Sequence, residues 1–391
     1  MSMKSLNSID EIVDKEDREL VELLQAMVKI PSWVPDDEEG KLTQNENKLV
    51  DFIESWLKAN TDLKVVRQKL DYGRFNLIAT KGKPEVIYLA HTDTVAPPVN
   101  SSYSAFGGEI HDGKIWGRGT ADMKSGIAAL MQAASFSSEA DNYAIFFYAD
   151  EEYDFLGMKA LVRDYSDLRP KHIISADGAD LRMGNGCRGL IEIRFRIIGK
   201  TAHAASGKGK NAVMGVYEVV KGVEEYLERH SSPQMGMSSL NLAYVFGGNH
   251  VGDMGIVNDR LVRVGQEGNV VPNIAEAVID IRPASPEITA KAVIAEMRRL
   301  AQKMGLVLEL VNERHNLGAW FTDRNDIKGF EILAAKVCKV PEVKFADTTK
   351  GGYLDIQMLW EAKKYGARIA GFGSQTQPLE VKRRVGLVSA S

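Results

Sequence analysis

The sequence has few cysteines, little net charge and no long apolar run. Two cysteines in 391 residues, Cys187 and Cys338, are too few and too far apart for a disulfide framework, which is typical of reducing compartments. The formal net charge of -4 gives no reason to expect a nucleic acid or an anionic membrane as partner. Apolar runs of about 18 residues do not occur, and the N-terminal segment is acidic where a signal peptide would be apolar. We therefore expect a cytoplasmic protein.

The pattern of apolar residues predicts an α/β domain in the first half of the chain. A length of 391 residues with 44% hydrophobic and 26% charged residues is ordinary for a globular protein of two domains. Apolar positions recur at helical spacing in residues 17–30 and 45–59. Short strands and helices then alternate up to residue 176, which predicts a helix-covered, mostly parallel central sheet.

A different order begins near Cys187. Residues 189–199 alternate as a strand, and a helix, two strands, a helix and a strand follow up to residue 311. This is the order of a ferredoxin-like α+β domain, here inserted as a lid. We predict a catalytic domain in two parts with this lid between them: residues 1–187, lid residues 188–314, and residues 315–391 with an atypical C-terminal end.

One histidine and several acidic residues follow the apolar runs that predict buried strands. His91 and Asp93 lie in VIYLAHTDTV, Asp122 in GRGTADMKSG, and Glu151 and Glu152 in AIFFYADEEYDFLG. Parallel strands deliver such residues to one edge of a sheet. Imidazole nitrogen and carboxylate oxygen bind zinc in catalytic sites, where one position stays open for water. The pattern therefore predicts a zinc hydrolase.

The spacing within these motifs indicates a division of roles. Asp93 lies two residues after His91, on the same face of an extended segment, where it can accept the second ring N–H and fix the tautomer. Glu151 and Glu152 point in different directions, so one can bind metal while the other acts as general base toward a metal-activated water. The glycines of GRGTADMKSG fit neither the Walker pattern nor a dinucleotide fingerprint, which excludes a nucleotide site.

These motifs, with GKTAHAAS and GNVVPNIAEAVIDIR further along, resemble those of a zinc-dependent aminoacylase and carboxypeptidase family. That family includes acetylornithine deacetylase, succinyl-diaminopimelate desuccinylase, glutamate carboxypeptidase and several dipeptidases. The resemblance runs from about residue 19 to about residue 373, with the motifs in the family's order. It implies two zinc ions, with cobalt or manganese as alternatives, and cleavage of an amide C–N bond in a small substrate.

The resemblance also assigns roles at the metal centre. His91 and Asp177 would bind one zinc, Glu152 would bind the second, and Asp122 would bridge the two. Glu151 would be the general base. Asp177 stands where many acylases and carboxypeptidases of the family have Glu, whereas Asp is more common in its dipeptidases and aminopeptidases, which favours peptides as substrates.

In the lid, the resemblance implies a homodimer. His203 would reach the active site of a partner subunit and stabilise the oxyanion, a role that suits a hydrogen-bond donor. Asn269 and Arg282 would hold a carbonyl or carboxylate of the substrate, for which the guanidinium fork of Arg is suited. The histidines outside the motifs are expected to be structural: His111, His172, His230, His250 and His315.

One departure from the family pattern leaves open whether this chain has full activity. The family places a last metal-binding His soon after a glycine-rich segment such as GFGS at 371–374, whereas no His follows His315 here. The available substitutes are Gln375, Gln377 or Glu380. Three hypotheses stay open: a deacylase of small N-acyl amino acids, which leads; a dipeptidase or aminopeptidase; and an impaired member that binds metal without full catalysis.

Overall fold

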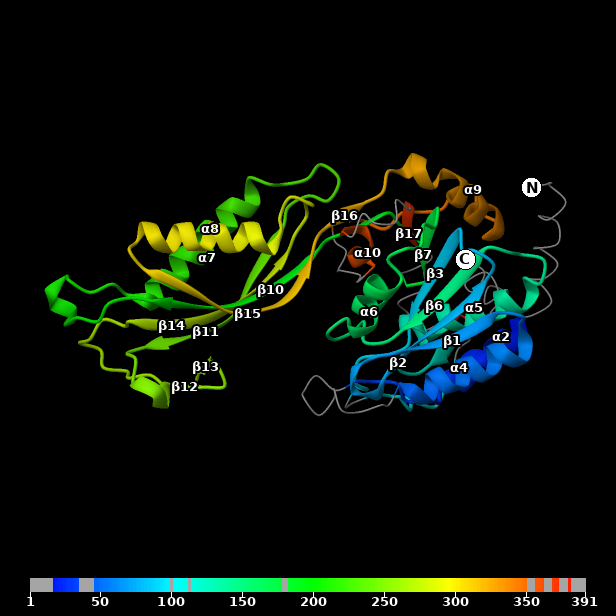
Figure 1. The fold of residues 1–391 in the computed structure, drawn as a ribbon, viewed down its shortest axis with the longest axis horizontal. Helices are drawn as coiled ribbons and strands as arrows, with labels where there is room; N and C mark the ends of the chain where they lie inside the picture. The colour runs from blue at the N-terminus through cyan, green and yellow to red at the C-terminus, as the bar shows by residue number, and fades with distance from the viewer. Residues whose placement is uncertain are drawn as a thin grey trace. The chain divides into compact units, whose positions relative to one another are not determined.

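The computed structural model describes residues 17–34, 46–98, 101–111, 114–177, 182–349, 356–361, 368–372 and 379–380 (Figure 1). The chain divides into two compact units. Unit 1 comprises Met1–Asn185, Thr322–Ala346 and Met358–Ser391, and unit 2 comprises Gly186–Phe321 and Asp347–Gln357. Within the described parts of the chain, no helix is both long and apolar enough to cross a membrane.

A seven-stranded sheet forms the centre of unit 1, with strand order β1-β2-β6-β3-β7-β17-β8. Strands β6, β3, β7 and β17 are parallel, while β1, β2 and β8 run antiparallel to their neighbours. The predicted helix-covered α/β sheet is confirmed, but it is mixed, because its parallel part is limited to the four central strands. The strands are β1 (Lys64–Lys69), β2 (Phe75–Lys81), β3 (Val86–His91), β6 (Tyr143–Tyr148), β7 (His172–Ser175), β8 (Met183–Gly184) and β17 (Arg368–Phe372).

Helices cover both faces of this sheet. On one face, α2 (Asp17–Val28), α4 (Asn47–Asn60) and α5 (Ser125–Phe136) form a core with Ala90 and Phe147. On the other face, α6 (Leu156–Asp164) and α10 (Gln357–Glu361) pack on Leu89 and Phe146. All six residues of β6 are buried, which explains why this strand reads as a continuous apolar run rather than an alternating one. Helix α9 (Lys328–Val337) packs on a smaller cluster with Met183.

Part of the C-terminal stretch pairs with the body of unit 1. Strand β18 (Leu379–Glu380) lies antiparallel to β5 (Lys114–Trp116), which in turn pairs with β4 (Glu109–His111). The atypical end therefore contributes a strand. This segment is too short to show a periodic pattern, so the sequence does not predict the pairing. Of the candidate substitutes for the last histidine, Gln375 and Gln377 lie outside the described residues, and Glu380 pairs in register with Lys114.

Unit 2 has the strand and helix order that the sequence predicts for a ferredoxin-like domain. Its sheet has the order β11-β14-β10-β15, with every pairing antiparallel, and the helices pack against a core formed by the sheet. The elements are β10 (Leu190–Ile198), α7 (Ala212–Glu228), β11 (Ser239–Gly248), β14 (Ile274–Arg282), α8 (Ala290–Lys303) and β15 (Val307–Leu317).

Two short pairings in unit 2 are absent from the sequence prediction. β9 (Gly186–Cys187) pairs with β16 (Trp320–Phe321), so the inserted unit runs to Phe321 rather than ending at residue 314. The hairpin of β12 (Ile256–Val257) and β13 (Arg260–Leu261) is also absent from the predicted elements. Elements of two residues carry no periodicity, which is why the sequence does not predict them.

Glu276 on β14 is the centre of a buried charge cluster in unit 2. Its side chain is 0% exposed and accepts hydrogen bonds from Arg194 and Arg196, both at 2.8 Å, and from the N–H of Leu261 at 3.0 Å. Burial would raise the pKa of this carboxyl, but the two arginines outweigh burial and lower it. Glu276 is therefore ionised and forms ion pairs with two guanidinium groups on β10.

We predict that Glu276→Ala lowers the free energy of unfolding by about 3 kcal/mol, because it leaves two arginines without their buried partner. The matched control is Glu309→Ala, since Glu309 lies 3.7 Å from Arg196 but its side chain is 52% exposed. The control substitution should lower the free energy of unfolding by less than about 1 kcal/mol. Urea denaturation of both variants measures the difference, and equal losses would show that Glu276 is not the centre of the cluster.

Candidate metal centre

His91 ends β3, and the residue is only 1% exposed. Its Nδ1 lies 3.1 Å from the backbone oxygen of Asp93 and 3.4 Å from the carboxylate Oδ1 of the same residue. Its Nε2 lies 3.0 Å from Oδ1 of Asp122. With the ring proton on Nδ1, the lone pair of Nε2 is directed at the side of the site where Asp122 lies, as a metal ligand requires.

Three groups predicted as metal ligands come together at this edge of the sheet. One side-chain ligand atom from each of His91, Asp122 and Asp177 lies within 4.8 Å of the other two. β3 and β7 are parallel neighbours, so the residues that follow them emerge side by side. The side chain of Asp122 is 63% exposed, which leaves room for water or substrate beside a bound ion. An imidazole and two carboxylates fit the donor set of a catalytic zinc site.

Asp93 holds the glutamate pair next to this group. Its two carboxylate oxygens accept the backbone N–H of Glu151 and of Glu152, each at 3.0 Å. The sequence predicts that this carboxylate accepts the ring N–H of His91, but the closer ring contact is to the backbone oxygen. Asp93 thus does more than orient the imidazole, because it fixes the turn after β6 that carries both glutamates.

The charges of the site favour a bound cation. Burial would lower the pKa of His91, but hydrogen bonds to Asp122 and Asp93 outweigh burial and raise this pKa well above its usual value. Burial, together with repulsion from Asp122 and Asp93, raises the pKa of Glu152 to about 7. The site therefore holds protons that a divalent cation would replace.

The sequence also predicts three residues for substrate contact in unit 2, and the structure places two of them, His203 and Asn269, on neighbouring segments. The N–H of Ala204 donates to the backbone oxygen of Asn269 at 2.8 Å, and His203 pairs with Val270. Nδ1 of His203 accepts the N–H of Ala205 at 3.2 Å. In the neutral imidazole the proton is therefore on Nε2, which leaves that atom as a hydrogen-bond donor.

Arg282, the third residue predicted to contact substrate, is already engaged. Its guanidinium donates to both carboxylate oxygens of Asp280, at 2.8 and 3.2 Å. A substrate carboxylate would have to compete with this ion pair.

The residues that support the glutamate turn are absent from the sequence prediction. Arg74 and Asn76 are buried at the start of β2 and bond to the segment around Glu151. The signal that could have found them is the pair of polar residues two positions apart, on one side of an otherwise apolar strand.

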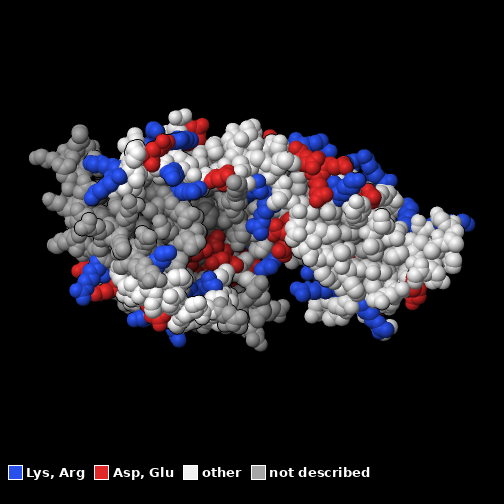
Figure 2. Space-filling view, turned by 180° about the vertical axis from the view of Figure 1, so that it is seen from behind, with Lys and Arg blue, Asp and Glu red and all other residues white. Residues whose placement is uncertain are grey.

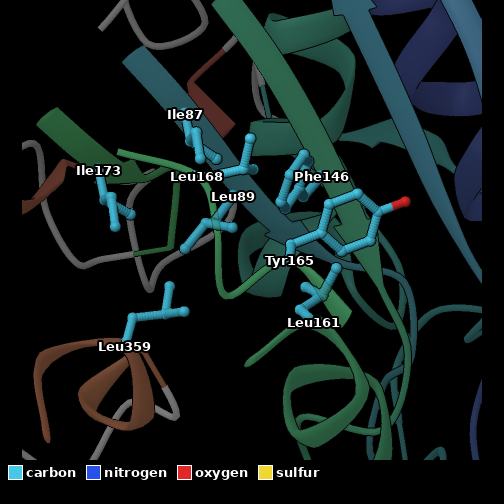
Figure 3. A pocket seen from close by; sticks show the side chains of 8 residues that line it. All are labelled: Ile87, Leu89, Phe146, Leu161, Tyr165, Leu168, Ile173 and Leu359. Carbon is cyan, nitrogen blue, oxygen red and sulfur yellow. The ribbon is translucent and has the colours of Figure 1, made fainter. Parts of the chain in front are cut away.

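A separate apolar cavity in unit 1 takes no part in this chemistry. The volume open to the centre of a water molecule is about 10 Å³, and the lining is apolar, so the cavity does not suit an ordered water. Figure 3 shows that its lining comes from the packing of α6 and α10 on the sheet, through Ile87, Leu89, Phe146, Leu161, Tyr165, Leu168, Ile173 and Leu359.

Comparison with known proteins defines the class. Residues 87–321, more than half of the chain, match the profile of peptidase family M20/M25/M40, and the chain belongs to this family of metal-dependent hydrolases. The family resemblance predicted from the motifs is thereby confirmed.

Relatives with two kinds of name align with the chain. A probable carboxypeptidase of Aspergillus clavatus is 27% identical over 329 residues, which cover 78% of this chain and 72% of that protein. An acetylornithine deacetylase of Pasteurella multocida is 27% identical over 224 residues, or 53% of this chain and 58% of that protein.

Two solved structures share the fold. The aminopeptidase PepT of Bacillus cereus has a TM-score of 0.69 and 19% identity, covering 96% of this chain and 98% of that chain. The dipeptidase Dug1p of Saccharomyces cerevisiae has a TM-score of 0.67 and 14% identity, covering 99% of this chain and 97% of that chain.

We predict that the affinity for zinc rises from about pH 6 to about pH 8 and that binding releases protons, because His91 and Glu152 must lose theirs to bind. The raised pKa values also mean that the protein without metal loses stability as the pH rises through about 7, where Glu152 ionises, and a bound cation should remove this loss.

Calorimetry in buffers of different ionisation enthalpy counts the released protons. His91→Ala should abolish most of the release, whereas His111→Ala, a variant of an outlying histidine near Glu109, should leave it unchanged. Affinity that is independent of pH, without proton release, would contradict the assignment of these two groups.

Proposed function

We propose that this chain is a zinc-dependent hydrolase that cleaves the amide bond of a small N-acyl amino acid. The observation that carries the proposal is the group of His91, Asp122 and Asp177, whose ligand atoms lie within 4.8 Å of one another. The fixed glutamate pair beside it supplies the acid–base group that amide hydrolysis needs.

Each residue then has a defined task. Bound zinc would polarise the scissile carbonyl and lower the pKa of a water molecule to about 7. Glu151 is 6% exposed, and its backbone is held by Asp93, so its carboxylate can take a proton from the attacking water and return it to the leaving nitrogen. Glu152, whose charge interacts with those of His91 and Asp122, is the candidate ligand of a second ion.

A dipeptidase or aminopeptidase is the second candidate. It is favoured by Asp177, since an aspartate at this position is what the resemblance associates with peptide substrates. The two names among the relatives, carboxypeptidase and acetylornithine deacetylase, leave both substrate classes to be tested. An impaired member that only binds metal is the third candidate, and turnover of any substrate would exclude it.

We further propose a homodimer through unit 2. β11 is an edge strand of its sheet, and it exposes Leu242, Tyr244 and Val245. The neighbouring helix α7 exposes Met214 and Tyr217. An open edge beside exposed apolar side chains fits a second copy of the same surface, and a twofold arrangement would let His203 serve the partner's site with its Nε2 proton.

The remaining predictions about partners agree with this proposal but stay predictions. Figure 2 shows basic and acidic side chains interspersed over the visible face, a distribution that favours a small-molecule substrate over a polyanion. Cytoplasmic location likewise stays a prediction.

We expect Glu151→Gln to lower kcat by about 10²-fold or more, because an amide cannot accept the proton of the attacking water. Bound metal should be unchanged, since Glu151 is not among the three grouped ligands. Rates on a panel of N-acetyl and N-succinyl amino acids and dipeptides, with Glu139→Gln as the exposed control in the same unit, measure the loss and identify the substrate class. Retention of more than a small part of the rate would exclude Glu151 as the base.

For the dimer, Val245→Glu should weaken association by about tenfold or more, since it places a charge in the apolar edge. Val307→Glu is the matched control, because Val307 is an exposed valine on β15 at the opposite edge of the same sheet. Light scattering at graded concentrations compares the two. A fully active wild-type monomer would contradict the cross-subunit role of His203.

A further inference from the structure

A buried arginine lies behind the turn that carries the two glutamates. Arg74 is 1% exposed, its Nη1 donates to Oδ1 of Asp150 at 2.7 Å, and its Nε donates to Glu46. Asp150 directly precedes Glu151, so the ion pair acts on the residue next to the proposed base. Both acidic partners are as buried as the arginine.

Asp150 closes the turn from within. Its second carboxylate oxygen, Oδ2, accepts the N–H of Leu156 at 3.0 Å and of Asp154 at 3.3 Å, and its backbone oxygen accepts the N–H of Phe155 at 2.8 Å. Its φ is +71°, a conformation that residues other than glycine hold only where their surroundings impose it. Arg74 helps to impose this conformation, because its ion pair fixes the Asp150 side chain.

Asn76 holds the two ends of the same segment. Its Oδ1 accepts the N–H of Ala149 at 3.0 Å, and its Nδ2 donates to the backbone oxygen of Gly157 at 2.9 Å. A Cβ added to Gly157 would lie 2.3 Å from the oxygen of Ala149 and 2.5 Å from Oδ1 of Asn76, so only glycine fits. Asn76 is two positions after Arg74 and therefore on the same side of the strand.

We propose that Arg74 and Asn76 are positioning residues for catalysis, which hold residues 149–157 so that Glu151 faces the metal centre. We call this pair the Arg74–Asn76 clamp. The inference rests on the proposed function, because it takes Glu151 as the base. It goes beyond that function by assigning a role to two residues that touch neither metal nor substrate.

The residue types of the Arg74–Asn76 clamp indicate that it positions residues 149–157 rather than stabilises the fold. Arg74 and Asp150 are removed from water, and such buried pairs seldom stabilise a fold more than apolar residues of similar size would. They fix directions, because the guanidinium of Arg74 binds two partners at once and the amide of Asn76 binds three. A displacement of about 1 Å at the base can lower a rate by about 10²-fold.

The first test compares Arg74→Met and Arg74→Lys with Arg67→Met. Arg67 on the adjacent strand pairs with Asp51 and Glu54 of α4, away from the glutamate turn. Arg74→Met should lower kcat by about 10²-fold with KM changed less than about threefold, and Arg74→Lys should recover part of the loss. Arg67→Met should leave both constants unchanged.

A double-mutant cycle separates positioning from general loss of structure. If Arg74 acts through Glu151, Arg74→Met should lower the residual rate of Glu151→Gln by less than about twofold, although it lowers the wild-type rate about 10²-fold. Multiplicative losses in the two backgrounds would overturn the proposal.

Hydrogen exchange tests the clamp without any substrate. In Arg74→Met and in Asn76→Ala, the amides of residues 149–157 should exchange at least about tenfold faster than in the wild type, while Arg67→Met leaves them unchanged. Unchanged exchange in both clamp variants would overturn the inference even if the enzyme is active. If the wild type hydrolyses no member of the panel, the proposed function fails, and exchange still decides whether the clamp holds the segment.

Discussion

The two hydrogen bonds that the Asp93 carboxylate accepts from the N–H groups of Glu151 and Glu152 join the ends of β3 and β6. This contact fixes the position of both glutamates relative to His91. Hydrogen bonds from His91 and from the N–H of Glu152 lower the pKa of the buried Asp93 against the effect of burial, so the group stays ionised and can accept both bonds. One short segment thereby orients an imidazole on one side and sets the direction of two glutamates on the other.

The electrostatics of the site are those of a centre built for a cation. Asp93 and the exposed Asp122 place like charges next to Glu152, and burial of Glu152 together with this repulsion raises its pKa. Such a cluster does not favour folding by itself, because each ionised carboxylate must be desolvated near the others. A divalent ion would convert the repulsion into attraction, which ties the stability of this part of unit 1 to metal binding.

The sequence predicts the parts of this site that follow from strand ends. His91 and Asp177 could be grouped because apolar runs mark β3 and β7, whose parallel ends lie at one edge. The expectation that Asp122 also follows a strand is wrong, because it lies in the segment Thr120–Lys124 that leads into α5. The actual partners of the Asp93 carboxylate could not be predicted, since spacing shows which way a side chain points but not which distant N–H groups reach it. Arg74 was missed for the same reason: Asp150 is far from it in sequence, and an isolated arginine beside a strand normally indicates a solvated edge. The antiparallel flanks of the sheet could not be predicted, because the residue pattern does not show in which direction the outer strands pair.

Anomalous diffraction at the zinc edge, from crystals grown with zinc, would locate the bound ions. We expect a strong peak within bonding distance of Nε2 of His91 and of carboxylate oxygens of Asp122 and Asp177, with the Glu151 carboxylate near it but not bound. A second, weaker peak between Asp122 and Glu152 would be the looser ion. Zinc at full occupancy on other residues, with no peak at His91, would contradict the claim that His91, Asp122 and Asp177 form the catalytic centre.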